Sequence, residues 1–144
     1  MMESIFCGLR RLFSPFRQKR SSPDLRELIR EGDSFLEEGR LDLALKLYRK
    51  AAMIGPGSSA EKRSATVLGM MGRYMEAIAS LDRAAKIDHF DHEIWMHRGF
   101  LFLRLERWQD ALASFERAAA LSPEDGYARY LRMEMAEEAK RRRI

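Results

Sequence analysis

The chain has 144 residues and a formal net charge of +4, and its 46% hydrophobic and 33% charged residues exclude a disordered chain and suit one helix-rich domain. A single cysteine, Cys7, excludes an intramolecular disulfide and favours a reducing compartment, so a cytoplasmic protein is expected. No apolar run approaches the roughly 18 residues that a membrane-spanning helix needs.

The first segment in chain order, residues 1–22, is basic and amphipathic. Its apolar residues recur at helical spacing, and its basic residues exceed its single acid, Glu3, by four. Such a helix can lie in a membrane interface, which makes a peripheral membrane adaptor one alternative. It can equally pack on the following helices, contact a second subunit or remain a flexible tail. The candidate residues for membrane contact or self-contact are Ile5, Phe6, Leu9, Leu12, Phe13 and Phe16.

Seven helices are predicted in residues 23–143 from apolar periodicity and from glycine and proline stops. The third has the weakest apolar stripe, because Glu61 and Ser64 lie where large packing residues are expected. The last is predicted to begin at Pro123 with Ser122 as its N-cap. The expected ranges are about 24–38, 41–53, 59–71, 74–87, 91–105, 108–121 and 123–142.

The charge of this body differs from that of the two ends. Residues 1–22 carry a net charge of +4, and the four basic residues 140–143 carry another +4. Because the whole chain has a net charge of +4, residues 23–139 carry a net charge of −4. A nucleic-acid-binding domain needs a basic face on the folded body. Nucleic-acid binding is therefore disfavoured, and the basic C-terminal run is interpreted as a solvated helix end that complements the helix dipole.

Small residues recur at a period of about 34. Ala44, Ala77 and Ala111 are 33 and 34 residues apart, and Gly32 and Gly99 occupy a second repeating position, which Ala65 fills in between. Small residues at fixed positions of such a period indicate stacked helix hairpins, since two helices approach closely only where one lacks a bulky side chain.

These positions resemble those of tetratricopeptide repeats, from about residue 25 to residue 143. The resemblance implies an all-α, right-handed superhelical array of antiparallel helix hairpins. Its repeats span about 25–57, 58–91 and 92–125, and a capping helix spans about 123–142. The middle repeat departs from the pattern, because it lacks aromatic residues and has His89 in place of the proline. The matching residues are Gly32, Ala44, Tyr48, Ala51, Pro56, Ala65, Ala77, Leu81, Ala84, Trp95, Gly99, Ala111, Phe115, Ala118 and Pro123.

The resemblance further implies a non-catalytic interaction scaffold whose first helices line a concave groove for a peptide or partner helix. Basic residues at the groove centre predict a partner that combines carboxylates with apolar anchors. The competing interpretation is that these charges form an ordinary solvated face. The candidate groove residues are Arg26, Ile29, Arg30, Asp33, Lys62, Arg63, Met70, Met96, His97, Phe100, Arg104, Tyr127 and Tyr130.

Chaperone-binding members of the family hold a terminal carboxylate with lysines, asparagines and an arginine on these helices. At the matching positions this chain has Ile29, Asp33, Arg63, Glu93 and His97. Only Arg63 and His97 keep any basic character, and Glu93 repels a carboxylate. A clamp for chaperone tails is therefore disfavoured.

The spacing of reactive residues indicates no catalytic, metal or cofactor site. His92 and His97 are five residues apart and point in different directions on one helix, and no cysteine or His-Glu pair completes a ligand set. We therefore expect a protein that is not an enzyme and binds no cofactor. A self-associating scaffold remains a third functional alternative, besides the groove-binding adaptor and the membrane-surface adaptor.

Overall fold

The computed structural model of the chain describes residues 24–143. Within this range all regular structure is helical, which confirms the predicted all-α class. Six of the seven helices begin and end within two residues of the predicted positions. Their bounds are α2 (Leu25–Glu37), α3 (Leu41–Ile54), α4 (Ser58–Met70), α5 (Tyr74–Ile87), α6 (His92–Arg104), α7 (Trp108–Leu121) and α8 (Gly126–Arg142). Residues 1–22, with the contacts predicted for Ile5 to Phe16, lie outside the described residues.

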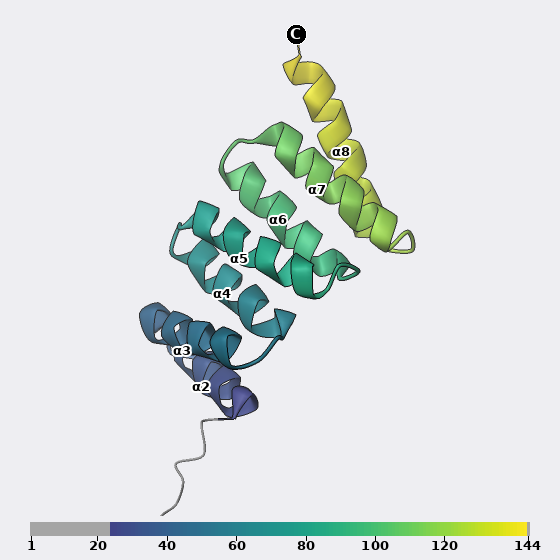
Figure 1. Cartoon of the computed structure of the whole chain (residues 1–144). Helices are drawn as coiled ribbons and strands as arrows, with labels where there is room; N and C mark the ends of the chain where they lie inside the picture. The colour runs from purple at the N-terminus through teal and green to yellow at the C-terminus, as the bar shows by residue number, and fades with distance from the viewer. Residues whose placement is uncertain (1–23, 144) are drawn as a thin grey trace, which may run out of the picture.

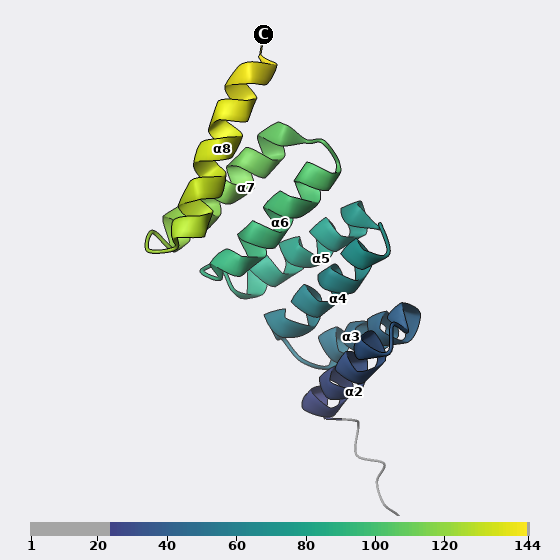
Figure 2. The same ribbon diagram turned by 180° about the vertical axis from the view of Figure 1, so that it is seen from behind.

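Successive helices form antiparallel hairpins that stack in chain order into a superhelical array (Figure 1). Each helix packs mainly against the helices before and after it in the sequence. The rear view shows α8 along α7 at the far end of the stack from α2 (Figure 2). The lone last helix therefore covers the final hairpin, as a capping helix does.

The repeating small residues lie where the two helices of a hairpin come closest. A Cβ atom added at Gly32 meets the Tyr48 ring at 2.5 Å, and one added at Gly99 meets the Phe115 ring at 2.6 Å. Both rings are fully buried. In the middle repeat, Ala65 takes the small position, and the opposing residue is a leucine instead of a ring. The glycines thus make room for aromatic side chains across the hairpin.

A residue in the left-handed region lies two positions after the end of the first helix of each repeat. Gly39 and Gly72 have φ of 74° and 76°, which is the helix stop predicted from their positions. The third repeat places Glu106 there, with φ of 56°. This residue tolerates a conformation that normally favours glycine.

The predicted start of the last helix is wrong by three residues. Asp125, and not Ser122, is the N-cap, because its carboxylate accepts hydrogen bonds from the amides of Tyr127 (2.9 Å) and Ala128 (3.2 Å). The Ser122 hydroxyl instead lies 2.9 Å from a carboxylate oxygen of Glu124. Residues 122–125 form a turn before the helix, so neither Glu124 nor Asp125 lies inside its first turn.

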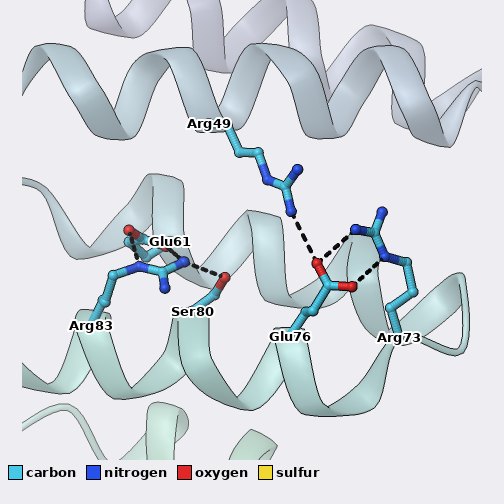
Figure 3. A network of polar contacts seen from close by, with 6 residues as sticks. All are labelled: Arg49, Glu61, Arg73, Glu76, Ser80 and Arg83. Carbon is cyan, nitrogen blue, oxygen red and sulfur yellow. Dashed lines mark hydrogen bonds and ion pairs between the residues drawn. The ribbon is translucent and has the colours of Figure 1, made fainter.

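Helix α4 compensates for its weak apolar stripe with polar contacts. The Glu61 carboxylate, 12% exposed, accepts hydrogen bonds from Arg83 of α5, whose guanidinium also contacts the Ser80 hydroxyl (Figure 3). In the same view, Glu76 of α5 lies between Arg73 and Arg49, and Arg49 extends from α3. The Arg49–Glu76 contact joins the first repeat to the second, between the second helices of their hairpins, whereas the Glu61–Arg83 contact joins the two helices of the second hairpin.

Candidate peptide-binding groove

One face of the array is formed by α2, α4, α6 and α8, and its surface is called the groove below. Polar contacts connect the first three of these helices in order along the face. Arg63 of α4 donates a hydrogen bond to Asp33 of α2, and Lys62 of α4 contacts Glu93 of α6 at 3.1 Å. Two predicted groove residues, Asp33 of the first repeat and Arg63 of the second, thus meet across neighbouring helices, whereas Lys62 meets Glu93, which is outside the predicted set.

The predicted groove residues differ in how far they are exposed. Those that are exposed are Arg26, Arg30, Met70, Phe100, Arg104, Tyr127 and Tyr130, and those that are half-buried are Ile29, Asp33, Lys62, Arg63, Met96 and His97. Ile29 and Met96 also pack against clusters of the core. Part of the predicted set therefore supports the fold as well as forming the surface.

A pocket of about 380 Å³ lies between α4 and α6 in the middle of the groove. Leu81 and Ile94 lie beneath it and are fully buried, so its accessible surface comes mainly from the side chains above them. Its walls carry charged and polar groups from both helices. The residues that line this central pocket are Ser59, Lys62, Arg63, Thr66, Leu81, Glu93, Ile94 and His97.

Asp33 connects the groove to the core of the first repeat. Its carboxylate accepts hydrogen bonds from the Tyr48 hydroxyl (2.5 Å) and from Arg63. Burial raises the pKa of Tyr48 above its ordinary value, and the hydrogen bond to Asp33 raises it further. Arg63 is thus held by an acid that also fixes a buried tyrosine.

Lys62 is held by two carboxylates. Its ammonium group lies 2.7 Å from Asp91, the N-cap residue of α6, and 3.1 Å from Glu93. Burial lowers the pKa of Lys62, but the hydrogen bonds to both acids outweigh this effect and the pKa is raised. Lys62 is therefore charged, and its charge is neutralised within the protein.

His97 contributes no positive charge at neutral pH. Burial lowers its pKa below the ordinary histidine value of about 6.5. The imidazole faces the central pocket as a neutral group. It can exchange hydrogen bonds with a partner but does not attract a carboxylate.

The end of the groove towards α8 is aromatic. Phe100 of α6 stacks on Tyr127 of α8 with ring centroids 6.4 Å apart, and its ring packs at 72° against buried Phe115 at 5.3 Å. Tyr130 lies three residues after Tyr127 and therefore shares its helix face. Phe100, Tyr127 and Tyr130 are called the aromatic shelf, and their exposed fractions are 36%, 57% and 54%.

Sequence reasoning missed the residues that pair with the groove cations. The sequence predicts an excess of basic residues at the groove centre and assigns no function to Asp91. In the structure, Asp91 is the acid that lies nearest to Lys62. Arg104, also expected to be available, donates to the Tyr74 hydroxyl at 2.9 Å. The signal that could have indicated this contact is the position of Asp91 as the N-cap of α6, the next groove helix after the one that carries Lys62.

Neither a metal centre nor a membrane span appears in the described part of the chain. Among residues 24–143, no group of three histidine, cysteine or acidic side chains is close enough to hold a metal ion. His92 instead lies 3.3 Å from Asp125. The described helices are also too short or too polar to cross a bilayer.

Stacked hairpins with a small-residue repeat, and an open face lined by their first helices, define a helical-repeat protein. A family model described as "Tetratricopeptide repeat" matches residues 63–125 and 98–141. The chain belongs to the tetratricopeptide repeat family. The match begins at Arg63, within the second repeat, so the first repeat is assigned from its own residues and its geometry.

Two curated relatives share part of their length with this chain. The protein SGT1 homolog of rice (Oryza sativa subsp. japonica) is 28% identical over 95 residues, which cover 64% of this chain and 25% of that protein. The translocation protein SEC72 of Saccharomyces cerevisiae is 31% identical over 67 residues, which cover 46% of this chain and 35% of that protein. The chain thus matches only a minor part of either relative.

A solved structure with the same fold is the first tetratricopeptide domain of Spaghetti (RPAP3) bound to the HSP90 peptide SRMEEVD. The two share 17% identity and superimpose with a TM-score of 0.74, over 83% of this chain and 96% of that one. At this identity the likeness establishes the fold.

Proposed function

We propose that this chain is a non-catalytic adaptor that binds a peptide or a helix of a partner protein in its groove. The central pocket between α4 and α6 carries this proposal, because it is a concave site whose polar and charged walls offer a partner hydrogen bonds. The solved structure of the Spaghetti domain, which holds a peptide, supports the same mode of use. With three repeats the groove is short, so affinity for one segment is expected to be modest.

Photo-crosslinking tests where the partner binds. Thr66 is exposed at the central pocket, and a photoreactive amino acid there should crosslink to partner peptides in cells of the source organism. Lys50 is equally exposed, on α3 outside the groove, and is the matched control position. The proposal predicts specific products at position 66 only. Equal labelling at both positions, or labelling at position 50 alone, contradicts it.

The basic segment of residues 1–22 supports a second proposal, that of an adaptor at the membrane surface. Its apolar stripe and positive charge are typical of interfacial helices. Anionic vesicles should sediment the full chain and should not sediment a Leu9→Asp, Phe13→Asp variant. If neither protein sediments, the membrane proposal fails. Sedimentation equilibrium of the same two proteins then tests the scaffold alternative, because self-association through this segment requires a wild-type dimer that the variant lacks.

A further inference from the structure

We infer that the groove recognises an internal apolar segment of its partner and does not accept a carboxylate at its centre. This inference rests on the proposed function, because it assumes that the partner lies in the groove. The partner chemistry is a stretch of aromatic or long aliphatic residues flanked by neutral polar residues.

The central cations are occupied by the protein's own acids. Lys62 contacts Asp91 and Glu93, and Arg63 contacts Asp33. These three carboxylates outnumber the two cations, and His97 adds no charge at neutral pH. A carboxylate from a partner either displaces one of these acids or adds a fourth negative charge beside two cations, so it gains little net attraction and still requires desolvation.

Glu93 adds repulsion to this competition. Its side chain is 70% exposed and lies at the rim of the central pocket, where an approaching anion meets it first. Lys62, at 31% exposure, lies deeper and is screened by the two acids. The charges of the pocket thus select against anions.

The remaining groove cations are also near polar partners. Arg26 and Arg30 share a shallow surface depression with Asp24 and Glu27 at the start of α2. Arg104 is hydrogen-bonded to a tyrosine hydroxyl of α5. None of these three arginines forms an ion pair with a described acid, so the neutralisation by acids is confined to the centre of the groove, where Lys62 and Arg63 lie.

The aromatic shelf supplies the attraction that the charges do not. Phe100 is held in place by a fully buried ring on one side and by Tyr127 on the other. A ring that is already ordered loses little conformational entropy when a partner covers it. Exposed tyrosines next to a pocket are side chains that often dominate binding energy. An apolar segment gains most by packing on this shelf.

The test compares two fluorescent peptides of about 12 residues, which span about 40 Å when extended. The apolar peptide has an internal Phe-Leu-Ser-Leu stretch, serine and glycine flanks and an amidated end. The acidic peptide has glutamates in place of the apolar residues and a free terminal carboxylate. Fluorescence anisotropy with the full chain should show tighter binding of the apolar peptide, with less than about a twofold change between about 50 and about 300 mM salt.

Two variants separate the shelf from the charges. Phe100→Ala with Tyr130→Ala should weaken binding of the apolar peptide at least about tenfold, whereas Met53→Ala, exposed on α3 outside the groove, should not. Asp33→Asn with Glu93→Lys frees Arg63 and should create measurable binding of the acidic peptide. This gain cannot come from a fold defect. Glu116→Lys, on α7, controls for nonspecific attraction.

Tighter binding of the acidic peptide by the wild-type chain, weakened by salt, overturns the inference. So does a failure of the apolar peptide to bind. If crosslinking at position 66 persists in that case, the groove still binds a partner, and only its chemistry has been assigned wrongly. If both fail, the proposed function itself is wrong.

Discussion

The second repeat and the repeats on either side of it reach the same hairpin geometry with different side chains. In the first and third repeats, a glycine faces a buried ring, in the pairs Gly32–Tyr48 and Gly99–Phe115. In the second, Ala65 takes the small position and Leu81 the large one, and both are fully buried. The fold therefore specifies a combined volume at this crossing and leaves its division between two residues open.

The second repeat also depends more on polar contacts. Glu61 lies where the pattern predicts an apolar residue, and it binds Arg83 across the hairpin. Ser64 is buried, and its hydroxyl has no hydrogen-bond partner. An ion pair that is partly exposed stabilises less than a buried ring does. We therefore expect the third repeat to lose more stability than the second when its crossing is disrupted.

The largest effect is expected from Phe115→Ala. Removing a fully buried ring leaves a cavity opposite Gly99, and the free energy of unfolding should fall by about 3–5 kcal/mol. Urea denaturation followed by circular dichroism measures this change. The control is Met133→Ala, whose side chain is 61% exposed and whose effect should stay within about 0.5 kcal/mol. Equal losses in the two variants contradict the assignment of Phe115 to the core.

Transplanting the pair of the second repeat into the third tests whether volume alone matters. Gly99→Ala places a methyl group against the Phe115 ring and should cost about 1–3 kcal/mol. Adding Phe115→Leu recreates the Ala65–Leu81 combination and relieves this clash. A double-mutant cycle should then show a favourable coupling of at least about 0.5 kcal/mol. If the effects of Gly99→Ala and Phe115→Leu on the free energy of unfolding simply add, the residue pair of the second repeat cannot replace that of the third.

Tyr48→Phe gives the first repeat the ring of the third and should cost about 1.5 kcal/mol, the lower end of the range for a hydrogen bond to a charged group, because Asp33 is partly exposed. The pKa of Tyr48 is raised in the folded state, above an unfolded value of about 10. The resulting stability is complete below pH 10 and is lost as the pH rises towards the folded pKa.

Alkaline unfolding of the two proteins measures this contribution. The wild type should lose stability more steeply above about pH 10 than Tyr48→Phe does. Tyr74→Phe, a half-buried tyrosine on α5, controls for the general titration of tyrosines. Parallel curves for wild type and Tyr48→Phe are the contrary result.

The smallest effect is expected from Arg83→Gln in the second repeat. The arginine side chain is 55% exposed, so loss of its contact with Glu61 should cost about 1 kcal/mol or less. The cost should shrink further in about 1 M salt, where exposed charges are screened. Lys86→Gln, one turn along α5, is the matched control, and thermal unfolding at both salt concentrations measures the difference. A loss that exceeds that of Gly99→Ala reverses the proposed order of the repeats.

The sequence by itself determined the repeat length, the hairpin order and most helix ends. These follow from local rules: small residues mark close crossings, and Gly39 and Gly72 take the backbone conformation that stops a helix. These rules did not locate the start of α8, because Ser122 and Asp125 are both residue types that cap helices and they lie three positions apart. Only the folded turn shows that Asp125 faces the free amides while Ser122 does not.

The chemistry of the groove was decided by the tertiary structure. The sequence identifies the helices that line it, and thus Lys62, Arg63 and the aromatic residues. It does not show that Asp91, 29 residues after Lys62, neutralises that lysine, or that Asp33 binds both Tyr48 and Arg63. Periodicity places a side chain on a face, but the free charge of that face depends on distances between helices, which exist only after the hairpins have stacked.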